Sequence, residues 1–125
     1  MNDLHSAPTM IHSWPEMYER LQELIPYLGR EAAGPMSGFA VLHKKALASG
    51  ALPGHIKELI ALGISVSSRC DGCIAYHVHD ALGAGATRAE ILEAIGVAVM
   101  MGGGPAVIYG AKALEALDQF QLSAA

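Results

Sequence analysis

The sequence predicts an all-α protein with five to six helices in a single domain. Apolar residues recur at spacings of three and four, which is typical of amphipathic helices, and we find no convincing strand alternation. Glycines, prolines and Ser/Thr-x-x-Glu sequences separate these stretches at helix length. The 125 residues fit one domain without linkers or low-complexity tracts, so we treat residues 1–125 as one unit.

The first helix is expected to begin at Ser13, which can cap it, with Pro15 and Glu16 in its first turn. It should run to about Leu28, although Pro26 is expected to kink it or end it early. Its apolar positions at helical spacing predict one buried stripe. The residues of this stripe are Met17, Leu21, Leu24, Ile25 and Leu28.

A second helix is expected to start at Gly34-Pro35 and to end at Gly50, a residue type that often caps helix C-termini. Apolar and aromatic side chains again share one side of this segment. They are Met36, Phe39, Ala40, His43 and Leu47.

Pro53 is expected to open a third helix, which Ser67 or Ser68 interrupts by capping the next one. That fourth helix should begin near Cys70 and end around Gly83 or Gly85. The third helix has its periodic positions at Glu58, Leu59, Leu62 and Val66.

Thr87 and Glu90 form a capping box for a fifth helix, and a final helix should follow the break at 102–105 and run to about Leu122. The uncharged stretch 94–111 approaches the length of a membrane span. Three glycines and a proline in its middle favour two buried helices instead, so we expect no membrane association. The inward positions of the fifth helix are Ile91, Ala94, Ile95, Ala98 and Val99.

The composition limits the classes of function. Hydrophobic residues make up 52% of the chain and charged residues only 16%, against about 25% in ordinary globular proteins. We therefore expect subunit contacts to cover part of the surface. The net charge is −4 and the eight Lys and Arg residues are scattered, which argues against nucleic-acid binding.

The N-terminal residues show neither a basic start nor an apolar run, so a cytoplasmic location is expected. In a reducing compartment, two cysteines spaced C-x-x-C rarely serve as a structural cross-link. They are more often redox-active or metal-bound.

Cys70, Cys73 and His77 fall on one narrow face of a helical wheel, whereas His79 falls on the opposite side. Cys73 and His77 are i,i+4 neighbours, so the imidazole can accept the proton of the thiol. The positive end of the helix also favours a thiolate, most strongly at Cys70. The spacing therefore predicts a reactive dithiol with His77 as its base, and a reversible disulfide between the two cysteines.

Two carboxylates are candidates for supporting this site. Asp80, three residues after His77, could orient the imidazole, although a solvated carboxylate is an equal interpretation. Glu58 has apolar neighbours and could face Cys70 and pass protons to it, if the third helix packs on the fourth. Considered alone, a carboxylate in a helix is usually solvated, which is the plainer interpretation of Glu58.

A zinc site is the rival interpretation of this segment. Cys70, Cys73, His77 and His79 offer four ligands, but His79 points away on a helix and closed sites usually draw on two separated pairs. We therefore expect no metal and no other cofactor. The remaining histidines show no partner spacing and are expected to be ordinary surface or core residues. They are His5, His12, His43 and His55.

Residues 53–101 resemble the carboxymuconolactone decarboxylase superfamily, specifically its alkylhydroperoxidase D-like branch. The shared pattern is a glutamate twelve residues before C-x-x-C, followed by x-x-x-H-x-x-x-A. The segment 85–91 also resembles the next turn and helix of that family. The residues that match the pattern are Glu58, Cys70, Cys73, His77 and Ala81.

The resemblance implies an all-α homotrimer or hexamer with peroxiredoxin-type oxidoreductase activity in antioxidant defence. It implies a hydroperoxide substrate, or a disulfide substrate, and an external thiol or dithiol reductant. Carried over to this chain, Cys73 attacks the peroxide, Cys70 resolves the sulfenic acid and His77 is the base. Glu58 relays protons to Cys70.

One departure from the pattern concerns Gly72, where the best-characterised members carry a second histidine. The rate and the substrate are therefore open, as are the reductant and the choice between trimer and hexamer. Two alternatives stay open as well: decarboxylase chemistry on a small carboxylic lactone, and a non-catalytic oligomer that senses redox state. The decarboxylase branch typically lacks the cysteine pair, which argues against the first of these.

Overall fold

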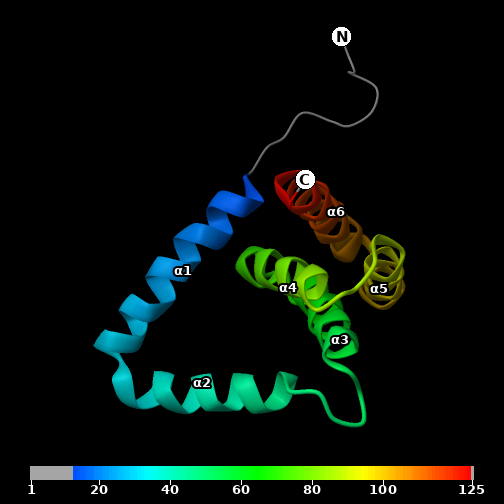
Figure 1. Ribbon diagram of the computed structural model, residues 1–125. Helices are drawn as coiled ribbons and strands as arrows, with labels where there is room; N and C mark the ends of the chain where they lie inside the picture. Colours follow the sequence, from blue (N-terminus) through cyan, green and yellow to red (C-terminus); the bar gives the residue numbers. More distant parts are fainter. Residues whose placement is uncertain (1–12, 125) are drawn as a thin grey trace.

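The computed structural model describes residues 13–124, which form six α-helices and no strand (Figure 1). This confirms the predicted all-α class. The helices are α1 (Trp14–Glu31), α2 (Ala33–Leu47), α3 (Gly54–Ser67), α4 (Asp71–Gly83), α5 (Arg88–Gly102) and α6 (Gly104–Ala124).

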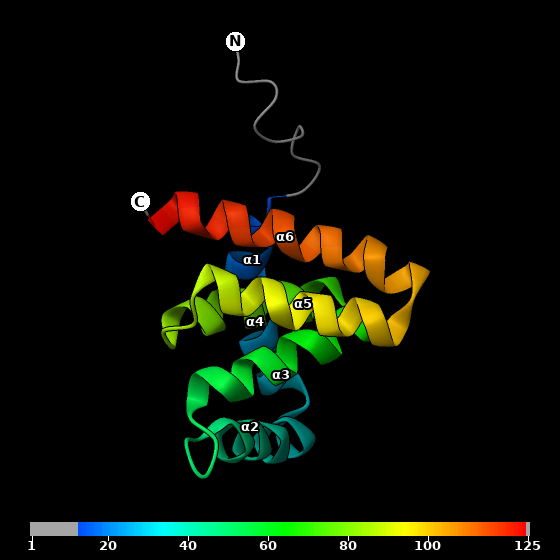
Figure 2. The ribbon, with the colours of Figure 1, turned by 90° about the vertical axis from the view of Figure 1, so that its right-hand side faces the viewer.

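Helices α3, α4, α5 and α6 lie together around the core (Figure 2). Small and branched apolar residues on their inward stripes let these helices approach closely. Of the described residues of α1 and α2, Trp14 in the first turn of α1 is the one that is fully buried. The largest fully buried side chains are Trp14, Leu62, Ile74, Ile91, Leu117, Val66 and Val78.

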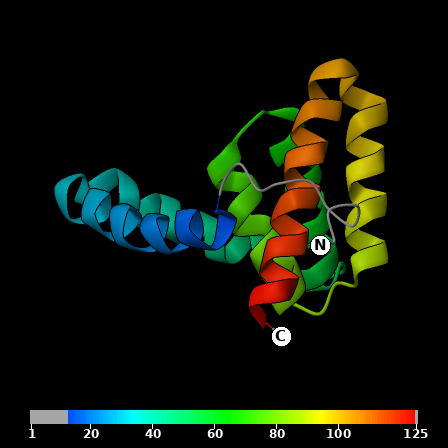
Figure 3. The same cartoon turned by 90° about the horizontal axis from the view of Figure 1, so that it is seen from above.

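Helices α1 and α2, here called the arm, project together to one side of the other four helices (Figure 3). At its start, the arm is fixed by Trp14, whose indole Nε1 donates a 2.8 Å hydrogen bond to Glu115 on α6. At its end, Lys57 on α3 donates hydrogen bonds to the carbonyls of Ala46 (3.0 Å) and Ala48 (2.6 Å). This ammonium group satisfies carbonyls at the C-terminus of α2, where a positive charge is favoured.

The predicted burial of the apolar side chains on the first two helices was largely wrong. Met17 and Leu21 are half-buried, but Leu24, Ile25 and Leu28 are exposed, and α2 has no buried residue. The reason is geometric, because the arm extends beyond the core that its apolar stripe was expected to cover.

Two predicted helix ends were wrong. α1 continues through Pro26 to Glu31, and Pro26 is exposed, so the carbonyl that loses its helical partner can be solvated. α2 ends at Leu47 with Ala48 as its C-cap, and Gly50 lies in the following turn. The final helix also runs two residues beyond the predicted end.

The caps explain where α4 begins. Ser68 donates its hydroxyl to the carbonyl of Ile64 and ends α3, so the prediction that Ser67 or Ser68 caps α4 was wrong. The chain then turns at Arg69, whose φ is 57°, and Cys70 occupies the N-cap position. The predicted caps at Ser13 and Thr87 are confirmed, the latter with its complete capping box.

Stretch 94–111 is divided between α5 and α6 at Gly103, whose φ is 68°. A Cβ atom on Gly102 would lie 2.7 Å from that of Ala106, so this turn requires glycine. Within residues 13–124, every helix is too short or too polar to span a membrane.

Candidate active site

The site is built around the first turn of α4. Cys70 at the N-cap and Cys73 in the first turn are joined by a disulfide, with their Cα atoms 5.2 Å apart. The backbone N–H of Cys73 also donates a 3.2 Å hydrogen bond to Sγ of Cys70. The sulfur of Cys70 thus caps the positive end of the helix, where a thiolate is favoured.

His77 lies one turn further along α4 and contacts Glu58 of α3. Its Nδ1 is 2.7 Å from Oε1 of Glu58, and the two side chains are only 17% and 11% exposed. An ionised carboxylate can only accept a hydrogen bond, so Nδ1 carries the proton and Nε2 is left to accept another. This arrangement suits the imidazole to act as a base.

The two carboxylates differ from their sequence interpretations. The simple expectation that Glu58 is solvated was wrong, because Glu58 is buried between α3 and α4. Its hydrogen-bond partner is His77, so Glu58 can exchange a proton with this imidazole. Asp80 does not orient His77: it pairs with Nδ1 of His79 at 2.9 Å.

His79 belongs to a separate cluster that fastens α1 to α4 and α6. Its ring stacks on Tyr18 with centroids 3.9 Å apart and meets Phe120 at 5.5 Å. Burial, followed by the charges of Asp80 and Tyr76, raises the pKa of Tyr18 above its usual value. His79 is therefore committed to this cluster, away from the thiols.

A zinc site needs several ligand side chains close together. Within residues 13–124, no three side chains among His, Cys, Asp and Glu are grouped so that they could hold a metal ion. Nearby, Asp71 in the first turn of α4 is paired with Lys112 of α6, at 3.3 Å.

His43 is a neighbour of the site that the sequence reasoning missed. Its ring lies on α2 with its centroid 6.4 Å from that of His77 and an interplanar angle of 24°. Phe39 follows on the same helix, 6.3 Å from His43. Nothing in the sequence spacing indicates that a side chain of α2 approaches His77. His55 instead lies 3.9 Å from Glu90, while His5 and His12 fall outside the described residues.

Close packing against α1 explains why glycine fits at position 72. A Cβ atom at this position would lie 3.1 Å from Cδ1 of Leu21, because α1 passes close to the first turn of α4. A larger side chain would have to displace Leu21. The position therefore contributes no acid–base group to the site.

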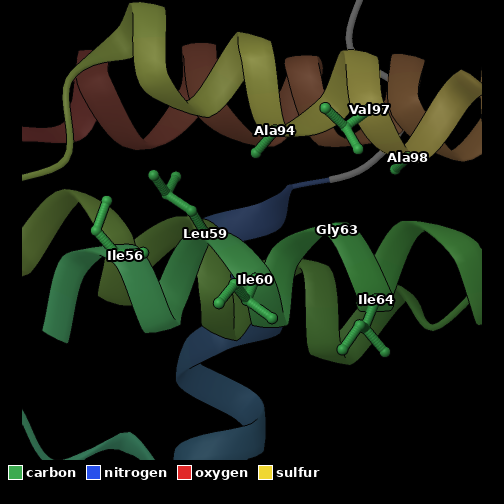
Figure 4. A pocket seen from close by; sticks show the side chains of 8 residues that line it. All are labelled: Ile56, Leu59, Ile60, Gly63, Ile64, Ala94, Val97 and Ala98. Carbon is green, nitrogen blue, oxygen red and sulfur yellow. The ribbon is translucent and has the colours of Figure 1, made fainter. Parts of the chain in front are cut away.

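A second feature is an apolar groove between α3 and α5, with a volume of about 370 Å³ (Figure 4). Leu59 of α3 points toward α5, whereas Ile60 and Ile64 lie on the side of α3 that faces the viewer (Figure 4). Ile60, Ile64 and Val97 are exposed. The lining residues are Ile56, Leu59, Ile60, Gly63, Ile64, Ala94, Val97 and Ala98.

Comparisons with known proteins agree with this geometry. A protein of uncharacterised function from Cupriavidus necator is 40% identical over 91 residues, which cover 73% of this chain and 80% of that protein. The crystal structure of a carboxymuconolactone decarboxylase family protein from Legionella pneumophila matches with a TM-score of 0.82 and 38% identity, over 86% of this chain and 96% of that one.

A Thermotoga maritima protein of the same family, named for a possible involvement in an antioxidative response, matches with a TM-score of 0.77 and 29% identity. That match covers 85% of this chain and 90% of the other. The sequence pattern of the carboxymuconolactone decarboxylase family itself matches residues 36–116, a range that includes the dithiol, His77 and Glu58. The chain therefore belongs to the carboxymuconolactone decarboxylase family.

Proposed function

We propose that this protein is a thiol peroxidase of the alkylhydroperoxidase type, which reduces a hydroperoxide and is regenerated by an external thiol or dithiol. The observation that carries the proposal is the disulfide between Cys70 and Cys73, one turn away from an imidazole that is held by a buried carboxylate. A dithiol beside an acid–base pair is what peroxide reduction requires.

The reaction begins when His77 takes the proton of Cys73. The thiolate attacks the terminal peroxide oxygen, the O–O bond breaks, and the products are a sulfenic acid on Cys73 and an alkoxide that is protonated to the alcohol. The thiol of Cys70 then attacks the Cys73 sulfur, so that the disulfide forms and water leaves. Two thiols of the reductant return two electrons and two protons.

Three observations support this sequence of steps. The Cα separation of 5.2 Å allows the disulfide without unwinding α4. The burial of His77 and Glu58 keeps water from weakening their interaction. The Thermotoga maritima relative is named for a possible antioxidative response. A disulfide reductase would use the same dithiol with a disulfide as its oxidant, so the oxidant must be tested directly.

We also propose that the protein works as a homo-oligomer, a trimer or a hexamer, in the cytoplasm. The groove between α3 and α5 and the exposed face of the arm are apolar surfaces that a second copy of this chain can cover. Met100, Met101, Val107 and Ile108, around the α5–α6 turn, add further exposed apolar surface.

A thiol titration tests the proposed activity. The reduced protein is pulsed with one equivalent of tert-butyl hydroperoxide, and free thiols, remaining peroxide and alcohol are measured. We expect two thiols to disappear per chain while one peroxide becomes one alcohol. The control is the double variant Cys70→Ser/Cys73→Ser, which should consume none. Peroxide consumption no faster than that of free cysteine would refute the peroxidase; oxidation by a disulfide substrate alone would assign the reductase instead.

A further inference from the structure

His43 of α2 has its ring beside that of His77, and the proposed steps leave it without a role. Its side chain is exposed, whereas His77 opposite it is mostly buried. Histidine is the side chain that most readily gives and takes a proton near neutral pH. Two imidazoles on different helices, with centroids 6.4 Å apart, therefore offer two proton-transfer groups to one reacting centre.

The geometry of α4 places that centre near Cys73. Side chains of a helix lean toward its N-terminus, so the imidazole of His77 covers the turn that contains Cys73. The ring of His43 lies beside that of His77, so a group bound over this turn against His77 is within reach of both imidazoles. A hydroperoxide group that lies between the two imidazole rings, with a hydrogen bond of about 2.8 Å to each ring, would fill a separation of about this size.

The proposed reaction moves two protons at different atoms. The thiol of Cys73 loses one at sulfur, and the alkoxide that leaves the peroxide must gain one at oxygen. His77 takes the proton of Cys73, and its Nδ1 lies 2.7 Å from Oε1 of Glu58, so a second group is needed close by to protonate the oxygen. Within residues 13–124, His43 makes no hydrogen bond or ion pair with a carboxylate, and its ring faces those of Phe39 and His77.

We propose that His43 is a second acid–base residue of this site, which protonates the oxygen of the leaving alkoxide. In this step the S–O bond forms, the O–O bond breaks, and the electron pair of that bond moves to the outer oxygen. This oxygen takes the proton of the His43 imidazolium, and the alcohol departs. Neutral His43 then regains a proton from water, to which its side chain is open, and His77 releases to water the proton that it took from Cys73.

This inference rests on the proposed function, and the choice of oxidant tests it. An alkyl hydroperoxide expels a strongly basic alkoxide and needs a proton donor, whereas peracetic acid expels a weakly basic carboxylate and does not. We expect His43→Gln to lower kcat/KM for tert-butyl hydroperoxide by about 10²-fold, the lower end for general acid catalysis. The rate with peracetic acid should change little.

His55→Gln is the matched control, because it makes the same change at a histidine of α3 that lies beside Glu90. It should leave both rates unchanged. As a second variant, His43→Ala should regain hydroperoxide activity when imidazole is added, because the position is open to solvent. Rescue distinguishes a proton donor from a residue that only packs.

The outcomes separate the two proposals. If wild-type protein consumes neither oxidant faster than free cysteine, the peroxidase proposal fails and the role of His43 falls with it. If wild-type protein is active, but His43→Gln slows both oxidants equally or neither, only the role of His43 is overturned. Loss of hydroperoxide activity in His43→Ala without imidazole rescue also counts against it.

Discussion

Nδ1 of His77 and Oε1 of Glu58 lie 2.7 Å apart, and they belong to different helices, α4 and α3. The orientation of the base beside the dithiol therefore depends on how these two helices pack. Such a carboxylate also determines which imidazole nitrogen carries the proton.

Replacing this carboxylate should slow the reaction without unfolding the protein. Glu58→Gln keeps an oxygen that can accept from Nδ1, but it removes the charge that stabilises the imidazolium. We expect kcat/KM for peroxide to fall, though by less than in His77→Ala, for which the loss of a general base predicts about 10²–10⁴-fold. Stopped-flow peroxide consumption measures this, with Glu93→Gln on the exposed side of α5 as control. A wild-type rate in Glu58→Gln would contradict the assigned role.

The two cysteines should differ in the oxidation product that they leave. Cys70→Ser should permit one turnover and leave a sulfenic acid on Cys73 that dimedone traps, whereas Cys73→Ser should react no faster than free cysteine. Mass spectrometry of the labelled peptide identifies the sulfur. The opposite result, a trapped sulfenic acid on Cys70 in Cys73→Ser, would contradict the assignment. It is the main alternative because Cys70 occupies the N-cap and its sulfur accepts a hydrogen bond from the N–H of Cys73. It would mean that the helix terminus outweighs His77.

Tyr18 should make the fold sensitive to alkaline pH. Burial, with Asp80 and Tyr76, raises its pKa in the folded chain above the unfolded value of about 10. The unfolded chain then loses this proton first, so the contribution to stability is complete below about pH 10 and is lost as pH rises through the folded pKa. In urea unfolding from about pH 8 to about pH 11, Tyr18→Phe should lose stability less steeply than wild type. Parallel curves would show that Tyr18 does not supply the dependence.

The groove should control assembly. Wild-type protein is expected to scatter light as three or six chains of 13.1 kDa, and Ile64→Glu to shift it toward smaller species. Ile64 is 62% exposed in the single chain, so a charge there disturbs an interface more than the core. Leu122→Glu, at the end of α6, is the control and should assemble normally. A stable wild-type monomer at micromolar concentration would end this proposal.

Local features of the chain could be predicted well from the sequence. The caps at Ser13 and Thr87 depend on neighbouring residues only, and so does the placement of the dithiol at the start of a helix. The Cys70–Cys73 disulfide could also be predicted from local spacing, because residues at i and i+3 have side chains that lie close together.

What the sequence could not supply was the relation between separate helices. The contact between Glu58 and His77 was not predicted, because it depends on the rotation of α3 against α4, and the relay from Glu58 to Cys70 stays a prediction. His43 was dismissed for the same reason. The exposure of Leu24, Ile25 and Leu28 has another cause, since helical periodicity marks an apolar face without saying whether that face meets the core of its own chain.

The arm is attached to the other helices at both of its ends, through Trp14 and through Lys57. The residues between these attachments are mostly exposed. Mutations between Leu24 and Phe39 remove little buried surface from the single chain, so they should have little effect on its folding stability. If related sequences keep apolar side chains at these positions, the reason is a contact with another molecule and not the folding of the single chain.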